Sequence, residues 1–396
     1  MAELLSLEDA LALVLEHARP LGAESVALDA AAGRVLAADA HATVDLPPFA
    51  SSAMDGFAVR AADLPGTLPV SARIAAGRPA GRALAAGEAM GIATGGVVPE
   101  GADAVIPIEH VVDNGNNVEI ANDASVGANV RPRGGDIAAG ALVCAAGTLL
   151  GPAQLGALAA AGLAELSCFS RPRAVVLTTG TELRRPGELL GPGEVYEANG
   201  LMLEAALASA GAAVERLPAV ADDESAHRAA LERGLGADLL VTSGGVSVGP
   251  HDLVRRIEAE LGVEEVFWRV AVKPGKPVSF GLRGRTLVFG LPGNPVSTLV
   301  AFELFVRPAV RALQGLVPGP RYEPGRLSRA LRRSPARDEL VRARASTGSE
   351  AIELEPVGGQ ESHMIARAAG ADVLVHVPRG EGELAAGATV RFLRLR

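Results

Sequence analysis

The chain has 396 residues, of which 48% are hydrophobic and 21% charged, and its formal net charge is −9. This length favours roughly two to four domains over a single core, and the composition is typical of a folded protein rather than a disordered one. The negative charge argues against a general nucleic-acid binder, because nothing in bulk would neutralise phosphates. Cys144 and Cys168 are the only cysteines, which argues against a disulfide framework and a structural zinc site.

A short helix is predicted at the N-terminus. Ser6 can cap this helix, Asp9 stands three residues on in a weaker form of the capping box, and Arg19-Pro20 ends it. The segment is acidic where a signal peptide needs a basic region, and no apolar run reaches the roughly 18 residues of a membrane span. We therefore expect a cytoplasmic protein that binds neither membrane nor nucleic acid.

Residues 45–145 are predicted to form an inserted β domain. Short β-branched runs such as VSARIAAG and DAVIPIEHVV are broken by Gly, Pro and Asn, which is the pattern of short strands. The small, polar segment SSAMDG is expected to be an exposed loop. The N-terminal helix and an Ala-rich helix within 151–168 are alike in style, and we expect them to pack together. Residues 1–44 and 146–170 would then form a small discontinuous helical domain.

The pattern changes at residue 171. Strand-like runs such as AVVLTTG and TLVFGLPG alternate with helices of roughly ten to fifteen residues, which predicts a mostly parallel, doubly wound α/β sheet with helices on both faces. This domain is expected to span 171–317 and to end in a long helix from Val296 to about Leu313. Residues 318–396 return to short strands such as LVRARAS, and a small β-barrel or sandwich fits them best.

One candidate anion loop follows the first strand of the α/β domain. In T-T-G-T-E-L, Gly180 permits close backbone approach, and the hydroxyls of Thr179 and Thr181 can donate to phosphate. Glu182 can meet a ribose hydroxyl or a cation. A plain turn with a solvated glutamate is an equally good interpretation of this loop.

A stronger anion loop is S-G-G-V-S-V-G, residues 243–249. Gly244 and Gly245 leave backbone N–H groups for an anion, and the hydroxyls of Ser243 and Ser247 add donors. The loop lacks both the ending of a nucleotide P-loop and the spacing of a dinucleotide fingerprint. It therefore predicts an anion site of neither common kind.

Two further turns complete this predicted site. K-P-G-K puts Lys273 and Lys276 on a rigid turn between two β-branched runs, so at least one should point across a crevice, where lysine serves an oxyanion as a compact charge. G-L-P-G-N-P starts the long helix, with Pro295 at its first position and Asn294 as its cap. A helix start of this kind is a ready anion site.

Three aspartates are candidates for metal or catalytic work. Asp252 opens a helix close enough to the glycine loop to hold Mg²⁺ against a phosphate, although a carboxylate at a helix start is more often only a dipole partner. Asp222 and Asp223 end a neighbouring strand. Either can serve metal or nucleoside, or simply cap the helix that starts at Glu224.

The β half carries weaker signals. Asp55 lies in S-A-M-D-G-F, Thr94 in A-T-G-G, and Arg131, Arg133 and Asp136 in R-P-R-G-G-D. The arginines pair with Asp136 structurally, or these loops face the α/β site and complete a crevice of mixed charge, in which case a second subunit is one way to bring them there. His363 is a lone histidine that we expect at the surface rather than among ligands.

Seven motifs, in order, resemble the molybdopterin molybdenumtransferases, the molybdenum insertases related to the C-terminal domain of gephyrin. The motifs are SSAMDGFAV, ATGGVVPEGADAVIPIE, VRPRGGDI, TGTEL, SGGVSVGPHD, VKPGKPVSFG and FGLPGNPVS. The resemblance covers essentially the whole chain. It implies a homodimer of four-domain subunits: the discontinuous helical domain (1–44 and 146–170), the inserted β domain (45–145), the α/β molybdopterin-binding domain (171–317) and a C-terminal β-barrel (318–396).

The resemblance also implies an activity. Members take adenylylated molybdopterin and molybdate, cleave the adenylate in a Mg²⁺-dependent step, and release AMP and the molybdenum cofactor. Asp252, with Asp222 or Asp223 nearby, would then serve the Mg²⁺ and the cleavage. Asp55 and Asp136 would take part from the partner subunit, so that the site lies at the subunit interface.

The same resemblance assigns ligand-binding roles. The pterin and adenylate would be contacted by Thr94, Arg131, Gly180, Thr181, Glu182, Ser243, Gly244, Gly245, Ser247, Pro292 and Pro295. Molybdate would be held by Lys273, Lys276, Arg342 and Ser362. A molybdopterin adenylyltransferase is a further partner that this activity suggests.

Three alternatives stay open at this point. The chain can be an adenylyltransferase that makes the adenylylated pterin with a related α/β domain, although the β half and the barrel argue against this. It can be a scaffold or cofactor carrier whose pocket persists without turnover. Tungstate matches molybdate so closely in size and charge that the sequence does not choose between them.

Overall fold

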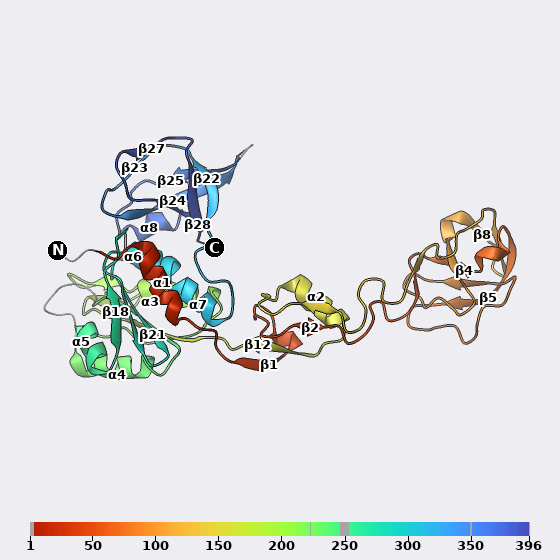
Figure 1. Ribbon diagram of the computed structural model, residues 1–396, viewed down its shortest axis with the longest axis horizontal. Helices are drawn as coiled ribbons and strands as arrows, with labels where there is room; N and C mark the ends of the chain where they lie inside the picture. Colours follow the sequence, from red (N-terminus) through yellow and green to blue (C-terminus); the bar gives the residue numbers. More distant parts are fainter. Residues whose placement is uncertain (1–3, 222, 246–252, 349–350, 396) are drawn as a thin grey trace. The chain divides into compact units, whose positions relative to one another are not determined.

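The computed structural model describes residues 4–221, 223–245, 253–348 and 351–395 (Figure 1). The chain divides into two compact units, one formed by Met1–Glu24 with Phe169–Arg396 and the other by Ser25–Cys168. Three predicted site residues, Asp222, Ser247 and Asp252, lie outside the described residues.

A six-stranded sheet in the order β16-β13-β17-β21-β20-β18 is the framework of the first unit. The first four strands are parallel, and β20 runs antiparallel to both of its neighbours. The chain moves from β13 to β16 on one side and then returns to β17 on the other, so the topological switch point lies between β13 and β17. The strands are β13 (Arg173–Thr178), β16 (Ala213–Arg216), β17 (Leu239–Ser243), β18 (Glu264–Trp268), β20 (Ser279–Arg283) and β21 (Thr286–Leu291).

Helices cover both faces of this sheet, as predicted. Alternate residues of each strand point to opposite faces, so Val176 of β13 joins one hydrophobic cluster and Val175 the other. The helices on the Val176 face are α3 (Asn199–Ser209), α6 (Pro295–Ala301) and α7 (Arg307–Leu313). Those on the Val175 face are α4 (Glu224–Gly234) and α5 (Leu253–Glu260).

The long helix predicted from Val296 to Leu313 contains a π-helical turn. This turn, η4 (Phe302–Val306), separates α6 from α7. Pro308 has no N–H to give to the carbonyl four residues earlier, and a π turn is one way for a helix to accommodate a missing bond.

The N-terminal helix α1 (Leu7–His17) is capped as predicted. Ser6 Oγ accepts from the Asp9 N–H at 3.0 Å and donates to the Asp9 carboxylate at 2.6 Å. Its packing differs from the prediction, because its buried residues Leu7 and Val14 join the core of the α/β sheet beside α7. The expected association with the helix in 151–168 is therefore wrong: the apolar stripe of α1 is buried by α7 and η4 instead.

The last part of the first unit is a closed barrel. Its strands follow the order β24-β25-β22-β28-β26, and a further pairing of β26 with β24 closes the circle. The short strand β19 (Val272–Lys273) pairs with β24, which attaches the barrel to the K-P-G-K turn. The barrel strands are β22 (Glu323–Leu327), β24 (Asp338–Thr347), β25 (Ile352–Pro356), β26 (Val373–Val377) and β28 (Thr389–Arg394).

The second unit contains a six-stranded sheet in the order β7-β4-β6-β5-β9-β8. These strands are β4 (Gly56–Val59), β5 (Gly66–Ile74), β6 (Ala89–Ile92), β7 (Ala104–Pro107), β8 (Val111–Asp113) and β9 (Asn117–Ile120). The segment SSAMDG is only partly the exposed loop that we predicted. Ser51 and Ser52 form β3, pair with β10 (Val130–Arg131), and are only 4% and 0% exposed.

The remainder of the second unit surrounds a small core of its own. It consists of α2 (Pro152–Ala160) and two strand pairs. The pairs are β1 (Ala23–Ala27) with β12 (Glu165–Phe169) and β2 (Ala40–His41) with β11 (Leu142–Cys144). Leu158 of α2 packs there with Cys144 and Cys168, which are free thiols.

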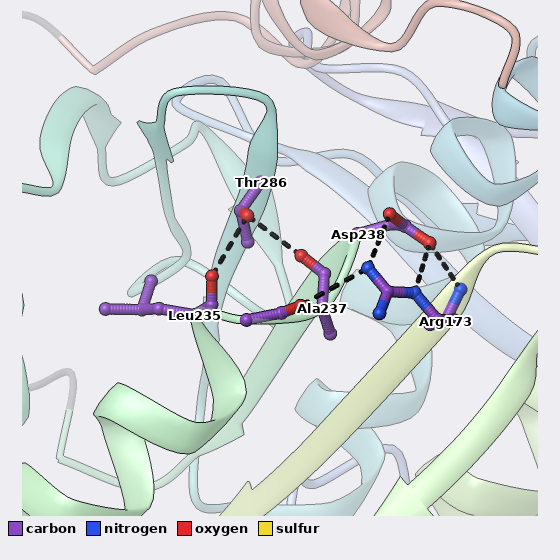
Figure 2. A network of polar contacts seen from close by, with 6 residues as sticks. Arg173, Leu235, Ala237, Asp238 and Thr286 are labelled. Atoms are coloured by element: carbon purple, nitrogen blue, oxygen red, sulfur yellow. Dashed lines mark hydrogen bonds and ion pairs between the residues drawn. The ribbon is translucent and has the colours of Figure 1, made fainter.

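Polar contacts align the starts of three parallel strands of the first unit (Figure 2). The backbone N–H of Arg173 donates to Asp238 at 2.8 Å, and the guanidinium bonds the same carboxylate. The Thr286 hydroxyl donates to the Ala237 carbonyl at 2.8 Å. Since β13, β17 and β21 start at one level, their opposite ends converge at one edge.

No helix in the described part of the chain is long and apolar enough to cross a membrane.

Candidate active site

A pocket of about 780 Å³ lies at the carboxyl ends of β13, β17 and β21. It coincides with the switch point of the sheet, where open α/β folds bind their ligands. The pocket brings together most of the predicted residues of the α/β loops: Gly180, Glu182, Ser243, Gly244, Gly245, Pro292 and Pro295. Thr181 lies in the same loop as Gly180, with its side chain exposed.

Backbone hydrogen bonds join the loops that form the pocket floor. The Thr179 N–H donates to the Ser243 carbonyl at 3.1 Å, and the Gly244 N–H donates to the Leu291 carbonyl at 3.2 Å. Gly180 donates to Val220 at 3.0 Å. These bonds fix the ends of three strands to one another, so the floor is held in place before a ligand arrives.

Gly244 and Gly245 occupy positions that only glycine fits. Their φ angles are +96° and +65°, in the region that side chains disfavour. A Cβ on Gly244 would lie 2.6 Å from the Thr179 carbonyl oxygen, and one on Gly245 would lie 2.6 Å from a methyl of Val254. The Gly245 N–H donates to no described residue.

Asn199, at the start of α3, is a site residue that the sequence analysis missed. Its side-chain amide donates to Ser243 Oγ at 2.9 Å and to the Gly293 carbonyl at 2.7 Å. The Ser243 hydroxyl in turn donates to the Pro292 carbonyl at 3.0 Å. Ser243 is therefore a buried brace between two loops rather than the free donor we predicted. The one available signal for Asn199 was an asparagine just before a helical pattern.

The start of α6 is already partly occupied by the barrel. The Val296 N–H donates to the Ser362 carbonyl at 3.0 Å. Asn294 stands at the cap position as predicted, but its side chain makes no capping bond and donates to Ser362 Oγ at 3.0 Å. The predicted anion site at this helix start thus has one donor fewer, and Ser362 lies beside the pocket. His363 is exposed and lines the pocket edge.

Arg342 is buried in the barrel, only 1% exposed. Its guanidinium donates to the carbonyls of Gly359, Glu361 and Met364 at 2.8–3.2 Å. These residues flank Ser362, so Arg342 holds the loop that presents Ser362. Burial lowers the pKa of Arg342 from its ordinary value, which is the cost of withdrawing the charge from water.

The two lysines of the K-P-G-K turn differ in their surroundings. Lys273 pairs with Glu339 of β24 at 3.2 Å. Lys276 is exposed and makes no ion pair with any described residue. Pro277, next to Lys276, lines the pocket. Lys276 is therefore a cation next to the pocket lining in sequence, and no carboxylate of the described residues pairs with it.

The pocket lining is acidic rather than basic. Glu182 and Glu197 line it, and no lysine or arginine does so among the described residues. The described residues also contain no cluster of three acidic, His or Cys side chains that could hold a metal.

Asp223 caps α4. Its carboxylate accepts from the Ser225 hydroxyl at 2.6 Å and from the Ala226 N–H at 2.7 Å, and these bonds lower its pKa. Of the alternatives left open for this residue, the structure shows the capping bond. A catalytic or metal role of Asp223 stays a prediction.

The four predicted residues of the β half lie in the second unit. Asp55 accepts from the Thr94 N–H at 2.6 Å and from its hydroxyl at 3.0 Å, and both bonds lower the pKa of Asp55. Arg131 lies on β10, whose partner β3 precedes Asp55. Arg133 pairs with Asp45 at 2.5 Å rather than with Asp136. The part that Asp55, Thr94, Arg131 and Asp136 play at the pocket stays a prediction.

Three family models match the chain in succession. Residues 5–162 match the MoeA N-terminal region (domain I and II), residues 175–312 match a probable molybdopterin binding domain, and residues 324–395 match the MoeA C-terminal region (domain IV). The second match contains the pocket floor, and the third contains the barrel with Arg342 and Ser362.

Full-length relatives agree with these matches. The chain is 41% identical over 392 residues to molybdopterin molybdenumtransferase 2 of Mycobacterium tuberculosis (strain ATCC 25618 / H37Rv), covering 95% of this chain and 96% of that protein. It is 34% identical to the molybdopterin molybdenumtransferase of Haemophilus influenzae, over 98% of both. A crystal structure of the molybdopterin biosynthesis moeA protein from Pyrococcus horikoshii OT3 superposes with a TM-score of 0.83 at 26% identity, covering 99% of this chain and 100% of that one. The chain therefore belongs to the molybdopterin molybdenumtransferase family of transferases.

Proposed function

We propose that the chain inserts molybdate into adenylylated molybdopterin, cleaving the adenylate and releasing AMP and the molybdenum cofactor. The observation that carries the proposal is the pocket at the switch point, with its glycine floor and with Ser362 beside it. Its volume of about 780 Å³ falls in the range of roughly 300–1,000 Å³ that small-molecule sites have. The names of the full-length relatives support the same chemistry.

The pyrophosphate of the substrate would lie over the glycine floor. Gly245 offers a backbone N–H that no described residue uses, and the close approach at Gly244 leaves no room for a side chain. Asn199 and Ser243 brace the floor, so its dipoles need little rearrangement as charge develops. Such preorganised donors are an effective way to stabilise a reaction of oxyanions.

The residues present fit a Mg²⁺ ion. Mg²⁺ takes one or two protein carboxylates when substrate phosphates supply other ligands, so the lack of a three-residue cluster among the described residues does not count against it. Glu182 lines the pocket and would be one such carboxylate; Asp252 is the predicted second. Bound Mg²⁺ would neutralise charge that develops on the pyrophosphate. The residues themselves orient the adenylate against the floor.

Molybdate would be held on the side of the pocket toward the barrel. Lys276 brings a charge that pairs with no described carboxylate, and Ser362 brings a hydroxyl that Asn294 already orients. Lys273 shares Glu339 and contributes less net charge. Since the guanidinium of Arg342 is occupied by three carbonyls, we propose that Arg342 positions Ser362 rather than touching molybdate.

The active form would be a homodimer in the cytoplasm. Asp55, Thr94, Arg131 and Asp136 belong to the second unit, and we propose that they reach the pocket from a partner subunit. The hydrogen bonds from Thr94 lower the pKa of Asp55, which favours the carboxylate form that attracts a cation. A molybdopterin adenylyltransferase is the proposed donor of the substrate.

The test is AMP release from adenylylated molybdopterin in the presence of molybdate and Mg²⁺. Lys276→Ala should slow cofactor formation, whereas Arg283→Ala, which removes one exposed charge outside the pocket lining, should not. Equal rates for the two variants would contradict the role of Lys276. Asp252→Asn should abolish AMP release, and unchanged cofactor production by that variant would count against its role.

The adenylyltransferase alternative predicts a different product. Incubation with molybdopterin and ATP would then yield pyrophosphate and the adenylylated pterin, and this result would overturn the proposal. Parallel reactions with tungstate measure the choice between the two oxyanions.

A further inference from the structure

A second cavity of about 310 Å³ lies in the first unit, away from the active-site pocket. Its walls are η4 and α7, the segment just before the barrel, and the end of β28. Six charged side chains line it: Glu303, Arg307, Arg311, Arg321, Glu323 and Arg394. None of these residues lines the active-site pocket.

Both glutamates of this cavity are already committed to arginines. Glu303 accepts two bonds from Arg307, at 2.6 and 2.8 Å. Glu323 accepts two bonds from Arg394, at 2.8 and 2.9 Å. Each of these bidentate arginine–carboxylate pairs has specific geometry and carries no net charge. They leave the remaining two arginines, Arg311 and Arg321, without a carboxylate partner among the described residues.

Arg311 is held in an unfavourable position for a cation. It is half-buried, and its guanidinium donates only to the Val317 carbonyl, at 3.2 and 3.3 Å. Burial lowers the pKa of Arg311, and the nearby charges of Arg321 and Arg307 lower it further. Positive charges that lie close together in a partly buried cavity repel one another unless a negative charge compensates them. Four arginines and two glutamates line the cavity, so two positive charges are not balanced by a carboxylate among the described residues.

We propose that this cavity binds a small phosphate-like dianion between Arg311 and Arg321. The planar forks of the two guanidinium groups match the edges of a tetrahedral oxyanion. The two negative charges of a dianion would also balance the two arginine charges that the glutamates of the cavity do not neutralise. The volume of about 310 Å³ admits a phosphoryl group with further atoms attached.

Free phosphate and a small phosphate monoester share this chemistry. Calorimetric titration of the full-length protein with inorganic phosphate and with glycerol phosphate, at constant ionic strength, distinguishes the two sources. Tighter binding of the monoester would assign the cavity to a phosphorylated metabolite, and equal or weaker binding would assign it to the free ion. The site does not depend on the proposed activity, so either can fail alone.

Three variants test the location. Arg321→Ala removes an exposed side chain and should not destabilise the fold. It should weaken phosphate binding at least tenfold, which is about the contribution of one charge-assisted hydrogen bond. Arg311→Gln should do the same. Arg283→Ala, an equal loss of charge outside this cavity, should bind phosphate as the parent protein does. Unchanged affinity in Arg321→Ala, or no binding of either anion by the parent protein, would overturn the proposal.

Discussion

The clearest consequence of the pocket floor concerns Gly244. Replacement by alanine carries two separate costs. At φ +96° an L side chain is strained, by about 1–2 kcal/mol, and the new Cβ would lie 2.6 Å from the Thr179 carbonyl oxygen, an overpacking worth about 1–3 kcal/mol. We expect Gly244→Ala to lower the free energy of unfolding by about 2–5 kcal/mol in sum.

Gly187 provides a matched control. Its φ is +95°, almost the same as that of Gly244, but an added Cβ would meet nothing within 4 Å. Gly187→Ala should therefore lose only the strain, about 1–2 kcal/mol. The difference between the two variants isolates the contact with the loop after β13.

Urea denaturation measures both variants through a single probe. Trp268 is the only tryptophan of the chain and lies on β18 of the same sheet as the pocket. The midpoint should shift more for Gly244→Ala than for Gly187→Ala at an unchanged denaturant slope. Equal losses in the two variants would refute the close packing of the floor. Activity should fall in Gly244→Ala alone.

Three further predictions follow from the same contacts. Asn199→Ala removes both braces of the pocket floor and should cost about 1–3 kcal/mol, with a higher KM for the adenylylated pterin; an unchanged KM would contradict its bracing role. Arg342→Met leaves three carbonyls unpaired and should cost about 3 kcal/mol or more, measured by calorimetry, with loss of molybdate use before loss of AMP release. Thr94→Val should raise the pKa of Asp55 toward its ordinary value, as followed by carboxyl NMR titration. The pKa of Asp55 is lowered in the folded protein. The stabilisation is therefore present above the ordinary pKa of an aspartate and is lost as the pH falls through the lowered pKa. The difference in stability between parent and variant should vanish in acid.

Much of the α/β half was predictable because its signals are local. A buried strand is a short β-branched run, and a glycine after it indicates a tight loop, so the positions of Gly180 and Gly244 followed from the sequence. Parallel strands bring such loops to one edge by geometry alone. The glycine positions of the pocket floor could therefore be predicted from the sequence. The Ser6 cap could be predicted as well, because it depends on residues only three apart.

Long-range partnerships were not predictable in the same way. Asn199 lies 94 residues from the Gly293 carbonyl that it binds, and nothing near either residue in the sequence records the other. The same holds for α1. Its apolar stripe can pack against any complementary helix face, so the sequence does not show that the partner is α7. Arg342 was assigned to molybdate by the family resemblance, and its neighbours in the strand do not reveal that its guanidinium donates to three carbonyls.

The K-P-G-K turn has a chemical consequence of its own. The chain has 37 lysines and arginines, and Lys273 and Lys276 are its only lysines. A reagent that acylates primary amines therefore reacts with this turn and with the α-amino group, and with no other side chain. Lys276 is exposed and unpaired among the described residues, whereas Lys273 shares Glu339. The protein thus accepts a fluorophore or cross-linker beside its proposed oxyanion site without any engineered cysteine.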